Sequence, residues 1–157
     1  MRIGFGFDIH PLVENKPLIL GGVNIPFEKG LEGHSDTDVL AHAVADALLG
    51  AAGLGDISQH FPDTDDKYKN FDSMIFLREI EKKINFEKLK ISNIDITLVL
   101  QKPKISPFKF QMQKNISDNL FLNLNRVNIK ATTSAKLAFV GSGEGVACYA
   151  VALLLPK

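Results

Sequence analysis

The most constraining feature of the chain is the strict alternation in its N-terminal stretch RIGFGFDIH, residues 2–10. Every second side chain is apolar, and the positions between are charged, polar or glycine. This period of two is typical of a β-strand, and it places Asp8 and His10 on one face near the end of the strand. Gly4 and Gly6 share that face and leave room for the close approach of another backbone or a partner.

A second informative stretch, HSDTDVLAHAVAD (34–46), indicates a loop that enters a helix. Ser35, followed three residues later by Asp38, has the form of an N-terminal capping box with Asp in place of Glu. Asp38, His42 and Asp46 are spaced by four and therefore project from one helix face. Two interpretations stay open for this face. It is a solvated polar stripe, or it is a metal or acid–base site centred on His42.

Composition limits the class of protein. The chain has 157 residues, of which 45% are hydrophobic and 23% charged, as expected of one globular domain over 1–157 that buries a real core. No apolar run is long enough to span a bilayer, and the N-terminus lacks the layout of a signal peptide. The single cysteine, Cys148, excludes an internal disulfide and fits a reducing compartment, so we expect a cytoplasmic protein without membrane partners.

The charges are unevenly distributed although they sum to zero. Residues 1–66 carry 11 acidic and 3 basic side chains together with all four histidines, whereas residues 67–157 carry 7 acidic and 15 basic ones. Carboxylates with clustered histidines suit a cation, and a basic remainder suits phosphates. Without net positive charge or interleaved aromatic and basic residues, we do not expect nucleic-acid binding.

The order of elements predicts the fold class. We expect strands over 2–10, 94–101, 126–133 and the C-terminal apolar stretch, helices over 34–50 (or to Gly53), 72–84 and from Ser106-Pro107 onwards, a hairpin at Gly21-Gly22, and loops over 26–34, 55–72 and 140–145. This indicates an α+β fold with a mixed four-stranded sheet, helices on one face and a small β-hairpin. The bare face must be covered, and an oligomeric contact through Phe5 and Phe7 is the simplest cover.

Three side chains are candidate metal ligands. Asp8-x-His10 on a strand and His42 on a helix supply three ligands of two kinds, as catalytic zinc sites do, with a fourth position left open. A lone D-x-H pattern is weak evidence, and His42 strengthens it because its helix is rich in carboxylates. Asp38 or Asp46 can orient a ligating imidazole, or both are ordinary solvated side chains.

Three other stretches have the chemistry to bind phosphate. Thr132-Thr133 at a strand end, with Lys136 nearby, offers hydroxyls and a charge, and Lys102-Pro-Lys104 before a helix start offers cations and backbone N–H groups. The glycine-rich VGSGEG lacks the Lys-Ser/Thr of a P-loop. By themselves these patterns are equally those of a strand end, a surface loop and a tight turn.

In combination, the chain resembles the 2-C-methyl-D-erythritol 2,4-cyclodiphosphate synthases of the non-mevalonate isoprenoid pathway. The resemblance rests on RIGFGFDIH, LGGVNIP, GLEGHSDTDVLAHAVADALLGAAGLGDI, HFPDTD, QKPKISP and KATTSAKLAFVGSGEG, which follow one another along nearly the whole chain. It implies a lyase that converts a cytidine-diphospho-methylerythritol 2-phosphate into the cyclic diphosphate and CMP. It also implies a homotrimer whose sheets face the threefold axis and whose active sites lie between subunits.

The resemblance further implies roles for individual residues. Asp8, His10 and His42 would hold one zinc ion per subunit, Asp8 and His10 would also contact substrate, and His34 and Thr133 would stabilise the transition state. The implied methylerythritol pocket comprises Ser35, Asp56, Ile57, Ser58, Phe61, Pro62, Asp63, Thr64 and Asp65. The implied cytidine diphosphate side comprises Leu100, Lys102, Pro103, Lys104, Ile105, Ser106, Thr132, Ser134 and Phe139. A Mg²⁺ or Mn²⁺ ion would bind the substrate diphosphate.

Three positions depart from the family pattern. Ala135 stands where the family usually has a Glu that holds the second divalent ion, so that ion would rest on substrate oxygens and water. Ser142 replaces an Arg that points into the central cavity of the trimer, and Ser58 replaces a common Gly. Two other functions stay open: a phosphohydrolase that uses zinc-bound water, and a non-catalytic metal-binding trimer, which would not need His34, Thr133 or the FPDTD segment.

Overall fold

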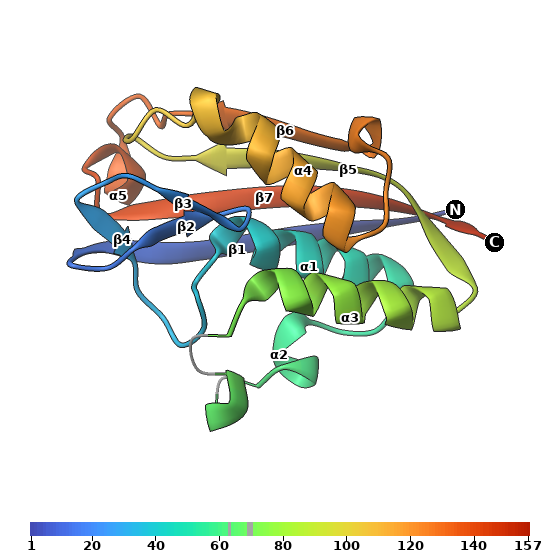
Figure 1. Ribbon diagram of the computed structural model, residues 1–157. Coiled ribbons are helices and arrows are strands. Elements are labelled where there is room, and N and C mark those ends of the chain that lie inside the picture. Colours follow the sequence, from blue (N-terminus) through green and yellow to red (C-terminus); the bar gives the residue numbers. More distant parts are fainter. Residues whose placement is uncertain (63, 69–70) are drawn as a thin grey trace.

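The structure is a computed structural model that describes residues 1–62, 64–68 and 71–157, and its centre is a mixed sheet (Figure 1). Along the chain the strands and helices are β1 (Arg2–Glu14), β2 (Leu18–Leu20), β3 (Val23–Ile25), β4 (Lys29–Leu31), α1 (Val39–Ala52), α2 (Ile57–His60), α3 (Ser73–Phe86), β5 (Leu89–Val99), α4 (Lys109–Asn119), β6 (Val127–Thr132), α5 (Ala138–Gly141) and β7 (Gly145–Pro156). Short 3-10 turns span Asp66–Tyr68, Ser106–Phe108 and Leu124–Arg126.

The sheet has five strands in the order β4-β1-β7-β5-β6, in which β5 and β6 are parallel and the other neighbours antiparallel. The predicted α+β class and the small hairpin, formed by β2 and β3, are confirmed. The predicted four-stranded sheet is wrong, because β4 lies within the expected loop 26–34 and pairs with the distal half of β1, Leu12 opposite Leu31. The three residues of β4 have a central glycine and are too few to show an alternating pattern. They form a strand because β1 is longer than predicted and offers an edge with which they pair.

The helices pack on one face of the sheet, with α1 beside α3 and α3 beside α4 (Figure 1). Close packing of α1 against β1 depends on two glycines. A Cβ at Gly4 would lie 1.9 Å from the Ala47 carbonyl oxygen, and a Cβ at Gly6 would lie 1.9 Å from that of Ala43. The room expected beside these glycines is therefore filled by a helix backbone, which brings His42 of α1 over Asp8 in the middle of β1.

The start of α1 differs from the sequence prediction. Asp38, and not Ser35, is the N-cap, and its carboxylate accepts the N–H groups of Leu40 and Ala41. The same carboxylate accepts the N–H groups of Gly21 at 2.9 Å and Gly22 at 2.7 Å, and it is completely buried. Asp38 is thus neither a solvated side chain nor a support for a metal ligand. It joins the turn of the β2–β3 hairpin to the first turn of α1.

The other helices follow the predicted signals. Asp72 caps α3 by accepting the Met74 N–H, and the stripe Met112, Ile116 and Leu120 is buried, while Phe108 at its start is half-buried. The helix expected from Ser106-Pro107 begins with a 3-10 turn and becomes α-helical at Lys109.

The opposite face of the sheet is open and apolar. Ile3, Phe5 and Phe7 of β1 and Val151 of β7 are 42–67% exposed, and the Phe5 and Phe7 rings contact the Tyr149 ring at centroid distances of 6.2 and 5.0 Å. A contiguous apolar patch of this kind marks an interaction surface. Among the described residues, no helix has the length and apolar character needed to cross a membrane.

Candidate metal centre and active site

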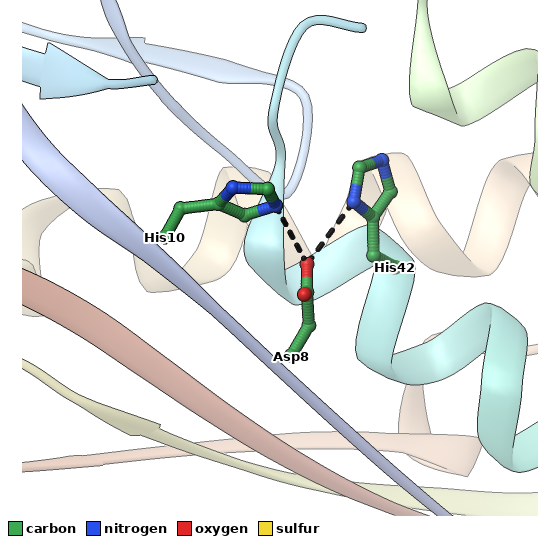
Figure 2. Close-up of side chains that lie close together, drawn as sticks. All are labelled: Asp8, His10 and His42. Atoms are coloured by element: carbon green, nitrogen blue, oxygen red, sulfur yellow. Dashed lines mark hydrogen bonds and ion pairs between the residues drawn. The ribbon is translucent and has the colours of Figure 1, made fainter. Parts of the chain in front are cut away.

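Asp8, His10 and His42 come together where the middle of β1 meets the first turns of α1 (Figure 2). The predicted position of Asp8 and His10 near the end of the strand is wrong, because β1 continues to Glu14, where it pairs with β4. Asp8 Oδ2 lies 3.1 Å from His10 Nε2 and 3.0 Å from His42 Nδ1. The three candidate ligand atoms lie within 4.8 Å of one another. One carboxylate and two imidazoles converging on one point match the donor set of a catalytic zinc site.

The His10 ring is oriented by the main chain. Its Nδ1 lies 3.0 Å from the Glu32 carbonyl oxygen, which can only accept, so Nδ1 carries the proton and Nε2 presents a lone pair to the cluster. That Nε2 is buried and has no hydrogen-bond partner in the described part of the chain. With its proton on Nδ1, neither Nε2 nor the Asp8 carboxylate 3.1 Å away can donate. A buried imidazole nitrogen that has no hydrogen-bond partner and lies beside a carboxylate is explained if both groups bind a metal ion between them.

The electrostatics of the cluster also suit a cation. Burial raises the pKa of Asp8, but the adjacent His10 and His42 rings lower it by more than burial raises it. The net result is a pKa of about 2. Burial lowers the pKa of His10, whereas the neighbouring Asp8 carboxylate raises it, and the net shift is upward. The carboxylate is therefore held in its ionised form, which is the form that binds metal.

The cluster opens into a cavity of about 320 Å³. The predicted site residues that line this cavity are Asp8, His10, His34, Ser35, His42, Ile57, Ser58 and Phe61. Gly33, Tyr68 and Phe76 also line it, although the sequence interpretation did not include them. Phe76 is a buried apolar residue of α3 whose ring lies 4.4 Å from that of Phe61, and a core pattern alone does not distinguish such a residue from a pocket wall.

The segment after α1 holds the remaining residues of the expected methylerythritol pocket. Asp56 caps α2 and accepts the Ser58 hydroxyl at 2.5 Å, while Asp46 of α1 accepts the Ile57 N–H at 2.8 Å. Ser58 lies inside α2 and is not among the positive-φ residues, so its replacement of a glycine causes no strain. Pro62 is half-buried, and Thr64 and Asp65 are exposed. The predicted site residue Asp63 lies outside the described residues.

Asp46 thus stabilises the start of α2 and makes no contact with a ring nitrogen of His42 or His10 among the described contacts. Burial raises its pKa, and the nearby Asp56 and Asp8 carboxylates raise it further, against the opposing effect of the Ile57 N–H. Its role is to position the pocket wall.

A second, separate cavity of about 440 Å³ gathers the expected cytidine side. Its lining residues are Leu100, Gln101, Lys102, Pro103, Lys104, Ile105, Ser106, Ala131, Thr132 and Thr133. Leu100 and Ile105 form a buried floor, while both lysines are exposed. Ser134 and Phe139 do not line it: the Ser134 hydroxyl donates to the Leu137 carbonyl, and Phe139 lies in α5. Ala135 is exposed with a positive φ of 53°.

One chain does not bring the two halves of the expected site together. Ile9 of β1 pairs with Ala147, Ala147 pairs with Val99, and Val99 pairs with Thr132. Asp8–His10 in the middle of β1 and the Thr132–Thr133 end of β6 therefore lie on the same row of the sheet, but three strand spacings apart, about 14 Å. His34 and Thr133 line different cavities.

Comparison with known proteins defines the class. The sequence model of the YgbB family matches residues 1–155, and the chain belongs to this family. It is 55% identical over 154 residues to the 2-C-methyl-D-erythritol 2,4-cyclodiphosphate synthase of Lachnospira eligens (98% of this chain, 84% of that one). It is 54% identical over 157 residues to the synthase of the same name from Clostridium novyi, covering 100% of both chains.

Solved structures agree with these sequence relatives. The bifunctional IspDF from Campylobacter jejuni superposes with a TM-score of 0.96 at 47% identity, covering 99% of this chain, which spans 42% of that longer protein. The CDP complex of IspF from Plasmodium falciparum superposes with a TM-score of 0.87 at 38% identity, covering 99% and 96%. The resemblance inferred from the sequence motifs is confirmed.

Proposed function

We propose that this chain converts 4-diphosphocytidyl-2-C-methyl-D-erythritol 2-phosphate into 2-C-methyl-D-erythritol 2,4-cyclodiphosphate and CMP in non-mevalonate isoprenoid biosynthesis. The observation that carries the proposal is the convergence of Asp8, His10 and His42 beside a cavity of about 320 Å³ in a chain about 55% identical to named synthases. A reducing cytoplasm is the compartment that suits its single buried cysteine, Cys148.

The reaction needs positioning more than covalent chemistry from the protein. An oxygen of the substrate's own 2-phosphate forms a bond to the β-phosphorus, and the bond from that phosphorus to the oxygen bridging the two phosphates breaks. CMP leaves with the bridging oxygen, and no water is consumed. The chain must therefore fold the substrate back on itself, neutralise phosphate charge and exclude water.

Asp8, His10 and His42 would hold a zinc ion, which when bound supplies Lewis-acid stabilisation of phosphate charge. Around this cluster, His34 and Ser35 offer hydrogen-bond donors at the mouth of the same cavity. The apolar wall of Phe61, Ile57 and Phe76 suits the carbon skeleton of methylerythritol, and the carboxylate of Asp56 with the hydroxyl of Ser58 suits its hydroxyl groups.

The cytidine diphosphate half would bind at the second cavity. Lys102 and Lys104 supply positive charge, and the hydroxyls of Thr132 and Thr133 supply donors for phosphate oxygens. Ala135 has no ligand atom, so a Mg²⁺ or Mn²⁺ ion at the diphosphate would be held by substrate oxygens and water. Ser134 and Phe139 remain candidates for contacts at the edge of this cavity.

The separation of the two cavities supports a homotrimer with active sites between subunits. In such a ring the metal half of one subunit faces the cytidine half of the next, which closes the gap of about 14 Å left within a chain. The same assembly would cover the exposed Phe5, Phe7 and Tyr149 around the threefold axis. This agrees with the expectation that the sheet face without helices is covered by an oligomeric contact.

Product analysis tests the proposal directly. Zinc-loaded protein with Mg²⁺ should convert the cytidine diphosphate substrate into equimolar cyclic diphosphate and CMP, with no free phosphate released. Phosphate release would favour a phosphohydrolase, in which metal-bound water attacks. Bound zinc without turnover, in the presence of Mg²⁺ or Mn²⁺, would favour the non-catalytic trimer. Full activity with zinc alone would contradict the need for a second divalent ion.

A further inference from the structure

The outer nitrogen of the His42 ring makes a contact that the metal cluster does not explain. Figure 2 shows one ring nitrogen turned toward Asp8 and the other turned away from the cluster. The outward nitrogen, Nε2, lies 2.9 Å from Ser73 Oγ, at the first residue of α3. Ser73 is completely buried, and its hydroxyl in turn donates to Asp36 Oδ1.

The direction of these hydrogen bonds follows from what each group can donate. A carboxylate oxygen accepts and does not donate, so the single hydroxyl proton of Ser73 is committed to Asp36. Ser73 Oγ then faces His42 with lone pairs only. The contact is favourable only when His42 Nε2 carries a proton, which leaves the Nδ1 lone pair pointing to the cluster.

Asp36 is itself fixed in place. Its Oδ2 accepts the Ser73 N–H at 2.8 Å, and its Oδ1 accepts the Asp38 N–H at 3.1 Å. The carboxylate therefore ties the loop before α1 to the first turn of α3. The relay from Asp36 through Ser73 to His42 thus leaves the start of α1, passes through a residue 37 positions further along the chain and returns to α1. Ser35 Oγ is a more distant neighbour of His42 Nε2, at 3.2 Å, and accepts the Thr37 N–H.

We propose that Ser73 and Asp36 are positioning residues of the metal centre, which hold His42 in the tautomer with its proton on Nε2 and its lone pair on Nδ1. His10 achieves the opposite tautomer through the Glu32 carbonyl, so the two rings present different nitrogens to one point. The inference deepens the proposed function, because it assumes that Asp8, His10 and His42 bind the metal. Partners of ligating imidazoles of this kind typically contribute 10–100-fold to metal affinity.

The test compares zinc affinity in three variants of the metal-free full chain by competition with a chromophoric chelator. Ser73→Ala removes the hydroxyl but leaves the backbone N–H that Asp36 accepts. Asp36→Asn keeps the shape, and with its oxygen on the Ser73 N–H its amide nitrogen replaces Oδ1. The amide then donates to Ser73 Oγ and frees the hydroxyl proton to point at His42, while the Asp38 N–H loses its acceptor. Ser117→Ala is the matched control, a buried serine whose hydroxyl bonds the Lys114 carbonyl within α4.

We expect both Ser73→Ala and Asp36→Asn to weaken zinc binding about 10–100-fold, and Ser117→Ala to leave it unchanged. Imidazole ¹⁵N chemical shifts provide a readout that a merely structural role would not move. In zinc-loaded wild-type protein, His42 should show metal on Nδ1 and a proton on Nε2. In metal-free Asp36→Asn, the population with a lone pair on Nε2 should rise at constant melting temperature.

Four results separate the possible failures. Wild-type affinity in both variants would overturn the relay, as would zinc on His42 Nε2 in the wild-type spectrum. If Ser73→Ala does not fold, Asp36→Asn and the wild-type spectrum still decide the matter. If wild-type protein takes up no zinc, the proposed metal centre itself is wrong, and the relay is wrong with it.

Discussion

The metal cluster and the cytidine-side cavity differ in how completely one chain builds them. Asp8, His10 and His42 are half-buried and converge on one point, and contacts from Glu32 and Ser73 hold the two imidazole rings. Lys104 and Thr133 are exposed around a shallow cavity three strands away. A subunit therefore carries one preorganised half-site and, under the proposed assembly, one that is completed by a neighbouring subunit. Changes at the first should abolish chemistry, whereas the loss of a single lysine at the second should mainly alter binding.

The largest effect should come from removing the helix ligand. His42→Ala should lose bound zinc and lower turnover by about three orders of magnitude or more, because phosphate charge is no longer stabilised. Zinc content by elemental analysis and the rate of CMP release check this. His60→Ala is the matched control, since His60 is a half-buried histidine whose Nε2 contacts the Leu54 carbonyl outside the cluster. Normal zinc content in His42→Ala would contradict the assignment of His42 as a zinc ligand.

The second largest effect should come from disturbing the close packing of α1 on β1, which places His42 in the metal half. Gly6→Ala places a Cβ 1.9 Å from the Ala43 carbonyl oxygen, so α1 must move away from β1 and carry His42 with it. We expect a loss of about 3 kcal/mol in the free energy of unfolding, measured in urea. Gly50→Ala on α1 meets no atom within 4 Å and should instead stabilise by about 0.5–1 kcal/mol. Equal effects of the two variants would contradict the close-packing argument.

The third effect concerns the cytidine half. Lys104→Ala should raise KM for the cytidine diphosphate substrate about tenfold and leave zinc content unchanged, because one charge-assisted phosphate contact is lost. Lys90→Ala, which removes an exposed lysine of β5 outside both cavities, is the control. An unchanged KM together with lowered zinc content would mean that the two halves are not divided in this way.

The smallest effect is the pH dependence of the metal-free protein. The lowered pKa of Asp8 contributes stability above its unfolded value of 3.8, and this is lost as the pH falls toward about 2. The raised pKa of His10 contributes stability below its unfolded value of 6.5, and this is lost as the pH rises past the folded value. Chelator-treated protein should therefore melt on the order of a few degrees lower at pH 8 than at pH 6.

His10→Ala isolates the part of this trend that belongs to the ion pair. The variant lacks the titrating ring, so the fall in melting temperature between pH 6 and pH 8 should shrink. A fall as steep as in the wild type would assign the pH dependence to other groups.

The sequence predicted those features that depend on local pattern. Alternation in β1 placed Asp8 and His10 together, and the helical spacing placed His42 within reach once Gly4 and Gly6 allowed close packing. The family motifs supplied what pattern could not, namely the expectation that residues about 14 Å apart in one chain serve one reaction.

Features that depend on long-range partners were missed. The cap of α1 is Asp38 because the Gly21 and Gly22 N–H groups of a distant hairpin also bind it, which a capping-box pattern does not reveal. The strand β4 exists only because β1 offers it an edge. The contact between Ser73 and His42 joins two helices that the sequence separates by a long loop.

Mixing two inactive variants tests the division of the site between subunits most directly. One chain carries His42→Ala, and the other carries both Thr132→Ala and Thr133→Ala; the two are unfolded together in equal amounts and refolded. If each site combines the metal half of one subunit with the cytidine half of the next, about a quarter of the sites in randomly mixed rings are intact, and about a quarter of the wild-type rate should return. No activity above that of the separate variants, in properly assembled mixtures, would contradict a site shared between chains.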